Sequence, residues 1–292
     1  SPMAAKADTV TLSTGKAPAQ SEVNYTLSLD GTWKMTSSGK ASDLAAGKGW
    51  DKAYDAQVPG SIYTALMDAG VIEDPYVGDN MKTANKYSEK SWYFCRTFTY
   101  EGKGERVELG FDGLCNVADI YLNGKKIPSH EGMFGGPFVD VTNIIKKGEN
   151  TLMVHLYPAK DYTQTVVFNC SYGWHYAKLY PLGIWQSVTV RDVPTVTLDS
   201  PFITTVDHTK GTVDLAIELD RQSSASLSGE LTVSFTPKNF TGTASYFTKT
   251  VSAGSVDSTT LRYRCDIPMR FTGALVASCD GETTRYGLFH TQ

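Results

Sequence analysis

The sequence lacks any apolar run long enough to form a membrane-spanning helix. It also carries little net charge, −4 at pH 7, and no stripe of lysine or arginine, which argues against nucleic acid as the main partner. The first residues are small and polar and contain prolines, and they lack the apolar core of a signal peptide. We therefore expect residues 1–22 to be a flexible, loosely ordered segment, either a mature N-terminus or an expression remnant.

Motifs for metal, redox or nucleophilic chemistry are also missing. The five cysteines have no Cys-x-x-Cys spacing, and His130-Glu131 is not followed by a second histidine four residues after the first. Neither a Gly-x-Ser-x-Gly elbow nor a glycine-rich phosphate loop occurs. The sequence therefore predicts no cofactor and no metal site. Cys265 and Cys279 lie in neighbouring predicted strands, where they could form a disulfide or remain buried free thiols.

Residues 106–156 carry the clearest indication of fold class. The first part has apolar residues on alternate positions with one small offset, at Val117, Ile120 and Leu122. Asn123-Gly124 follows, a pair that tolerates the positive φ angles of a tight hairpin turn. The last part again alternates, with three apolar side chains on one face, Leu152, Val154 and Leu156. Such runs are typical of half-buried antiparallel strands.

The first domain is expected over residues 23–193. Trp33 lies in an early predicted strand and is best explained as a core anchor. Ser61 is expected to cap a short helix that Gly70 ends, with one apolar face formed by Ile62, Leu66 and Ala69. Residues 71–91 read as a long, polar, irregular loop, a feature that is often functional. Strands are predicted again at residues 92–98 and 183–190, and no second helix is expected.

The second domain is expected over residues 194–292, after a linker at residues 192–194. Short runs alternate apolar and polar residues, and turns such as Ser228-Gly229 separate them. About seven strands within about a hundred residues are typical of an immunoglobulin-like sandwich. The chain is therefore predicted to be all-β, with an antiparallel first domain and a sandwich as the second domain.

Six segments of the first domain resemble glycoside hydrolase family 2, in the order expected for that family. They are LDGTWKM (29–35), VPGSIYTALMDAGVIEDPYVGDN (58–80), WYFCRTF (92–98), FDGLCNVADIYLNGKKI (111–127), MFGGPFVDVTNIIKKGENTLMV (133–154) and GIWQSVTV (183–190). The second segment resembles the β-mannosidase and exo-β-glucosaminidase branch more than the β-galactosidases. The resemblance implies a galactose-binding-like jelly-roll β-sandwich followed by an immunoglobulin-like β-sandwich.

The resemblance also implies that this chain holds no catalytic residue. In the family, one glutamate acts as acid/base and a second as nucleophile, and both lie on a TIM barrel after the sandwiches. Such a retaining pair stands about 5–5.5 Å apart, and a barrel needs about 250 residues. The Asn-Glu dipeptide that holds the family's acid/base is missing, and the chain stops where the barrel would begin. The expected function is the non-catalytic N-terminal part of a retaining, exo-acting β-glycosidase that hydrolyses O-glycosidic bonds.

The family's first domain lends loops to the rim of the active site, and two segments here match those loops. One contains Asp79 and Asn80, whose carboxylate and amide suit sugar hydroxyls, although a turn with a side-chain-to-backbone hydrogen bond would explain them equally. The other contains Trp174, His175 and Tyr176. Here His175 replaces the aspartate of the β-mannosidase motif Gly-Trp-Asp-Trp, so the resemblance leaves the sugar open. Core packing for Trp174 and a structural role for His175 are the alternatives.

The expected partners are a carbohydrate with a terminal β-linked sugar and a C-terminal catalytic barrel. Two other functions fit the same residues. A free-standing carbohydrate-binding module would use aromatic loop residues such as Tyr76 and Trp174, and a structural two-sandwich protein would use none of them. The resemblance and the Ala/Ser/Thr-rich start together imply a secreted or periplasmic protein.

Overall fold

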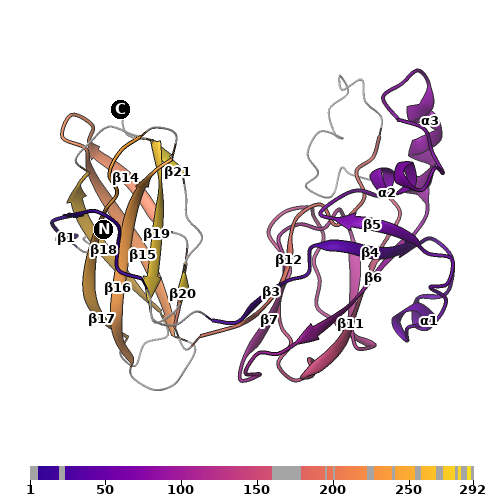
Figure 1. Ribbon diagram of the computed structural model, residues 1–292, viewed down its shortest axis with the longest axis horizontal. Coiled ribbons are helices and arrows are strands. Elements are labelled where there is room, and N and C mark those ends of the chain that lie inside the picture. Colours follow the sequence, from indigo (N-terminus) through magenta and orange to yellow (C-terminus); the bar gives the residue numbers. More distant parts are fainter. Residues whose placement is uncertain are drawn as a thin grey trace, which may run out of the picture. The chain divides into compact units, whose positions relative to one another are not determined.

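The computed structural model describes residues 6–19, 24–159, 179–194, 196–199, 201–221, 227–238, 241–253, 258–267, 272–279, 282–283 and 288–290. They belong to two compact units, both built mainly of strands (Figure 1). The central unit is Tyr25–Asp192, close to the first domain expected from the sequence. The terminal unit combines Ser1–Asn24 with Val193–Gln292. Among the described residues, no helix is both long and apolar enough to cross a membrane.

The central unit contains two antiparallel sheets. The strands are β3 (Thr26–Ser28), β4 (Gly31–Thr36), β5 (Tyr54–Val58), β6 (Trp92–Tyr100), β7 (Val107–Phe111), β8 (Ala118–Leu122), β9 (Lys125–Ile127), β10 (Phe138–Asp140), β11 (Gly148–Leu156) and β12 (Val188–Asp192). One sheet has the order β10-β7-β12-β3 and the other the order β5-β4-β6-β11-β8-β9. Because the order departs from the chain sequence in both sheets, connections cross from one sheet to the other, as the predicted sandwich requires.

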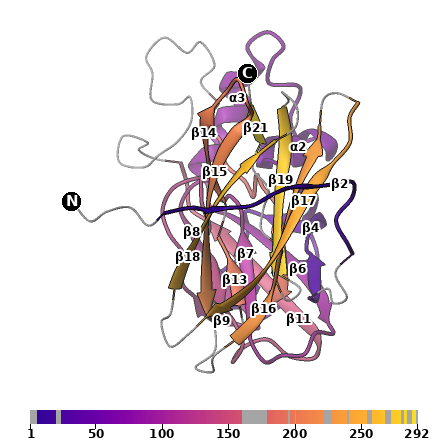
Figure 2. The same ribbon diagram turned by 90° about the vertical axis from the view of Figure 1, so that its left-hand side faces the viewer.

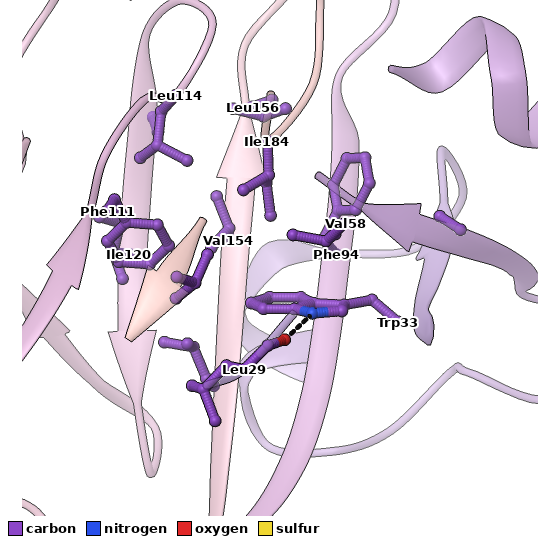
Figure 3. Packing of buried hydrophobic residues seen from close by; sticks show 14 of the residues in the cluster. Leu29, Trp33, Val58, Phe94, Phe111, Leu114, Ile120, Val154, Leu156 and Ile184 are labelled. Atoms are coloured by element: carbon purple, nitrogen blue, oxygen red, sulfur yellow. Dashed lines mark hydrogen bonds between the residues drawn. The ribbon is translucent and has the colours of Figure 1, made fainter. Parts of the chain in front are cut away.

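The core of the central unit lies between these two sheets. Phe111 comes from the four-stranded sheet, whereas Phe94, Ile120 and Val154 come from the six-stranded one, and all are buried in one cluster (Figure 3). Trp33 is 1% exposed, and its indole N–H donates to the backbone oxygen of Leu29 at 2.7 Å. The prediction that Trp33 anchors the core is confirmed, and its buried donor is satisfied.

The hairpin predicted at Asn123-Gly124 is confirmed. Asn123 has φ 51° and Gly124 has φ 78°, and they join β8 to β9. The predicted offset in β8 was wrong, because Ala118, Ile120 and Leu122 alternate without interruption on the buried face. Val117 stands before the strand and forms an isolated bridge with Glu131 instead.

The helices of the central unit are α1 (Ala41–Ala45), α2 (Ile62–Asp68), α3 (Asn80–Asn85) and the 3₁₀ helix η1 (Lys86–Glu89). Ser61 caps α2 as predicted, since its hydroxyl oxygen accepts from the backbone N–H of Thr64 at 3.2 Å. Ala65, rather than the predicted Ala69, completes the buried face of α2. The expectation of a single helix was wrong: α3 and η1 lie within residues 71–91, and α1 covers Tyr93 and Met153 on the outer face of the six-stranded sheet.

The terminal unit also contains two sheets. Its strands are β1 (Asp8–Thr9), β2 (Ser13–Thr14), β13 (Val196–Leu198), β14 (Phe202–Asp207), β15 (Thr212–Arg221), β16 (Leu227–Pro237), β17 (Ser245–Ala253), β18 (Ser258–Asp266), β19 (Thr272–Cys279), β20 (Glu282–Thr283) and β21 (Leu288–His290). One sheet runs β1-β18-β15-β13 with β14 beside β15, and the other runs β2-β17-β16-β19-β20 with β21 beside β19. Apolar side chains of both sheets, such as Leu215 and Val233, share one core. The unit is a β-sandwich, and its immunoglobulin-like character stays a prediction.

In the terminal unit, Cys265 and the N-terminal residues can be compared with what the sequence predicted. Cys265 is a buried free thiol, and burial raises its pKa to about 12, so the free-thiol alternative holds for this residue. Residues 1–22 were expected to be loosely ordered, but β1 pairs with β18 and β2 pairs with β17. Figure 2 shows this stretch, in indigo, crossing the strands of the terminal unit. That expectation was wrong for Asp8–Thr14, because two apolar side chains, Val10 and Leu12, pack into the core.

Candidate functional site

The segment between α2 and β6, residues 71–91, carries the first pair of predicted site residues. Asp79 stands at the N-cap of α3 without capping it through its side chain. Its carboxylate lies 3.1 Å from the ammonium of Lys82, and both side chains are more than three-quarters exposed, at 87% and 80%. An ion pair this exposed contributes about 0–1 kcal/mol, so it holds the carboxylate only weakly.

Asn80 is more firmly placed than Asp79. Its side-chain amide donates to the backbone oxygen of Asp74 at 3.0 Å, and its backbone N–H donates to Val77. The side-chain-to-backbone hydrogen bond of a turn therefore occupies the amide nitrogen of Asn80. Its amide oxygen can still accept a hydrogen bond. Asp74 also accepts from the backbone N–H of Tyr76 at 2.9 Å. The resulting loop presents Tyr76, 78% exposed, close in sequence to Asp79 and Asn80.

Hydrogen bonds fix the later part of this segment to distant parts of the central unit. The side-chain oxygen of Asn85 accepts from the backbone N–H of Tyr180 at 2.9 Å. The backbone oxygen of Ser88 accepts from the N–H of Ala159 at 2.8 Å. The hydroxyl of Tyr63, on α2, donates to the backbone oxygen of Tyr180 at 2.6 Å. Ala159 and Tyr180 are therefore both held against the elements α2, α3 and η1.

The second set of predicted site residues, Trp174, His175 and Tyr176, lies outside the described residues. What the structure places are the chain positions just beyond that stretch, Ala159 on one side and Tyr180 on the other. Ala159 contacts the segment 71–91 at Ser88, and Tyr180 contacts it at Asn85.

An aromatic cluster beside this region was not predicted from the sequence. The indole N–H of Trp185 donates to the backbone oxygen of Met133 at 2.7 Å, and Phe134 meets the Trp185 ring edge-to-face at 5.4 Å. Ala159 packs against the same cluster. Phe134 is 47% exposed and stands next to Gly135 and Gly136, both with positive φ. The two glycines in MFGGPF (133–138) could have indicated this cluster in the sequence, because a turn built on them presents the apolar Phe134 to solvent.

A stack of rings on the outer face of the six-stranded sheet was also missed. His155 lies between Tyr93 and Tyr157, with ring centroids at 4.3 and 4.1 Å. Its Nε2 is 3.0 Å from the hydroxyl of Ser91, the last residue of the segment described above. Burial is the main cause that lowers the pKa of His155, and a hydrogen bond to Asp119 raises the pKa of Tyr157 to about 12. His155 therefore fixes the end of the segment as a neutral side chain.

Carboxylates that could hold a metal ion come together at one place among the described residues. Asp199, Glu218 and Asp220, in the terminal unit, have oxygen atoms within 4.8 Å of one another. Exposed acidic groups of this kind are common without an ion, so we assign no metal site to them.

Comparison with known proteins identifies the family to which the central unit belongs. Residues 33–194 match the family described as the glycosyl hydrolase 2 galactose-binding domain-like family. The chain belongs to this family. The match covers nearly all of the central unit, so the two sheets around Trp33 are the galactose-binding-like domain, as the sequence resemblance implied.

Curated relatives of this galactose-binding-like chain are glycosidases. The β-mannosidase of Mus musculus is 26% identical over 241 residues, which are 70% of this chain and 26% of the mouse protein. The exo-β-D-glucosaminidase of Streptomyces avermitilis is 27% identical over 251 residues, which are 77% of this chain and 27% of that protein. The chain spans about a quarter of the length of these relatives.

Solved structures agree on the fold of the galactose-binding-like chain. The β-D-mannosidase of Dictyoglomus thermophilum has a TM-score of 0.70 at 22% identity and covers 87% of this chain and 34% of its own. An exo-chitosanase of Amycolatopsis orientalis has a TM-score of 0.67 at 20% identity and covers 91% and 34%. The β-sandwich fold is thus shared with this β-D-mannosidase and this exo-chitosanase.

Proposed function

We propose that this chain is the non-catalytic N-terminal part of a retaining, exo-acting β-glycosidase. The parent enzyme would hydrolyse O-glycosidic bonds to terminal β-linked sugars through a C-terminal catalytic barrel. The observation that supports this most is the family match over residues 33–194, which occurs in a chain that spans about a quarter of the length of its glycosidase relatives. The described residues form two β units and no barrel of alternating strands and helices.

In this proposal the segment 71–91 borders the sugar site of the parent enzyme. Asp79 supports it because a solvated carboxylate in a weak ion pair can exchange Lys82 for two sugar hydroxyls. Asn80 would add its amide oxygen, and the exposed ring of Tyr76 could stack on a sugar face. Trp174, His175 and Tyr176 are proposed as further contacts on the strength of the family resemblance alone.

A comparison of the isolated chain with its parent tests the proposal. The 292-residue chain should show no turnover of chromogenic β-glycosides, whereas the longer protein should hydrolyse at least one. Turnover by the isolated chain would overturn the non-catalytic role. In the longer protein, Asp79→Ala should raise KM about tenfold, because a charged hydrogen bond is worth about 1.5–3 kcal/mol. Asp68→Ala, an exposed aspartate on α2, is the matched control and should leave KM unchanged.

A carbohydrate-binding module is the second candidate, favoured by the 78% exposure of Tyr76. Isothermal titration of the isolated chain against an oligosaccharide panel separates the two functions. Binding that Tyr76→Ala abolishes would favour the module. Absence of binding would fit a sugar site that needs the barrel.

We also infer that the parent enzyme is secreted or periplasmic. The family resemblance and the Ala/Ser/Thr-rich first residues support this location. Fractionation of the native host, with an antibody against this chain, would test it. Recovery of the protein with cytoplasmic markers would contradict the inference.

A further inference from the structure

We propose that Asp8–Thr14 act as a donor strand that closes the terminal unit, and that the edges of β17 and β18 form its acceptor. The partner of this acceptor surface is thus the N-terminal segment of the same chain. The proposal is independent of the glycosidase role.

Backbone hydrogen bonds join the segment to both sheets. At its start, β1 runs parallel to β18, with Thr9 opposite Arg264, and the N–H of Val10 donates to the backbone oxygen of Arg264 at 2.8 Å. At its end, β2 runs antiparallel to β17, and the N–H of Gly15 donates to the oxygen of Ala244 at 2.7 Å. Since β18 and β17 belong to different sheets, one short segment bridges the sandwich.

Side chains of the segment complete the core between those sheets. Val10 is 7% exposed and belongs to the same cluster as Phe247 and Tyr263, and Leu12 packs against it half-buried. Thr9 and Thr11, on the other face, are exposed. Val10, Leu12 and Cys265 also line an open pocket of about 400 Å³. Removal of the segment would expose the apolar neighbours of Val10 to water.

The segment also occupies the strand edges of the terminal unit. Without β1 and β2, the strands β18 and β17 would be the outermost strands of their sheets on this side. Unpaired edges present free N–H and C=O groups that recruit strands from other molecules. A strand supplied by the same chain blocks this self-association.

The chain path favours a donor from the same molecule. The segment leads into β3, and the chain returns to the terminal unit from β12, which is the neighbour of β3. The N–H of Asp192 donates to the backbone oxygen of Tyr25 at 2.9 Å, where β12 ends and β3 is about to begin. Both connections therefore leave the central unit side by side, which gives the donor strand a high effective concentration at its acceptor.

Cleavage of the connection in the full chain tests the proposal. A protease site placed at residues 20–23 would separate the donor strand from the remainder without removing it. We expect the N-terminal fragment to co-elute with the remainder in native size-exclusion chromatography and to separate in urea. All five tryptophans lie within residues 25–192, so calorimetric unfolding without a change in tryptophan fluorescence reports the terminal unit.

Removal of the fragment should lower the melting temperature of the terminal unit by about 5 °C or more, and a synthetic peptide of residues 6–19 should restore it. In the uncut chain, Val10→Asp should lower this melting temperature and promote aggregation, while Thr11→Asp, which adds the same charge at an exposed position, should not.

Release of the fragment under native conditions with an unchanged melting temperature would overturn the proposal, as would equal effects of the two substitutions. A dimer that exchanges labelled N-terminal segments between copies would overturn the assignment of the donor to the same chain.

Discussion

The side-chain oxygen of Asn85 accepts a hydrogen bond from the backbone N–H of Tyr180 at 2.9 Å, across 95 positions of sequence. This contact fixes the end of α3 to the chain that leads into β12. Together with the bond from Ala159 to Ser88, it holds two distant stretches against the segment that carries Asp79 and Asn80. The segment proposed to border the sugar site is therefore tied to a distant part of the chain through the Asn85 amide.

Asn85→Ala should reduce the free energy of unfolding of the central unit by about 1 kcal/mol, because the Tyr180 N–H loses its acceptor. Asn85→Asp keeps an acceptor oxygen at the same place and should recover most of that loss. Urea unfolding followed by tryptophan fluorescence measures both. Equal destabilisation by the two variants would show that the amide nitrogen, not the oxygen, is the group that matters.

Substitution of Asn150 should reduce the free energy of unfolding more than substitution of Asn85 does. Asn150 is 1% exposed, and its side chain organises two turns. Its oxygen accepts from the N–H of Lys146 and the amide of Asn123, both at 2.8 Å, and its nitrogen donates to the oxygens of Lys146 and Gly148. Asn150→Ala leaves several buried groups unpaired and should cost about 3 kcal/mol in urea unfolding. Asn150→Asp should also destabilise, because it replaces the donor with an acceptor facing two carbonyls. Wild-type stability of either variant would contradict this role.

Much of the central unit could be predicted because its signals are local. The hairpin at Asn123-Gly124 follows from the positive φ angles that this pair tolerates, and the helix cap at Ser61 follows from the first turn of the helix after it. The strand at residues 152–156 follows from the alternation of apolar and polar residues. The offset assigned at Val117 was wrong because the strand begins one residue later, at Ala118, and every buried position then has the same parity.

Features that depend on distant partners could not be predicted. The donor strand alternates over only four residues, with Val10 and Leu12 inward and Thr9 and Thr11 exposed, and its pairing partners lie more than 200 positions away, so the sequence alone did not reveal its pairing. The burial of His155 between two tyrosines could not be predicted either. Both faces of β11 are covered, one by the core and one by the stacked rings of Tyr93 and Tyr157. The candidate residues Asp79 and Asn80 came from the family resemblance, while their anchor through Asn85 came only from the structure.

Gly183 should not tolerate a side chain. A Cβ there would stand 2.4 Å from the backbone oxygen of Gly60 and 2.8 Å from the Cα of Ser61, and both are backbone atoms that cannot move aside cheaply. Gly183 also exchanges backbone hydrogen bonds with Cys115 in both directions. Gly183→Ala should therefore cost at least about 2 kcal/mol in urea unfolding. Gly47→Asn is the control, because that site has open space and a φ of 81° that asparagine tolerates, so it should cost less than about 1 kcal/mol. Similar losses in both variants would contradict the steric explanation.

Acid should destabilise the central unit through His155. Its folded pKa is lowered, mainly by burial between Tyr93 and Tyr157, whereas the unfolded value is about 6.5. The unfolded chain therefore binds the extra proton first, and stability is lost as the pH falls through about 6.5 towards the lower folded pKa. One such group gives a slope of at most about 1.4 kcal/mol per pH unit. His155→Gln keeps a polar side chain near Ser91 but cannot titrate, so its stability should fall less steeply between pH 7 and pH 5. Parallel pH profiles of urea unfolding for wild type and His155→Gln would assign the acid sensitivity to other groups.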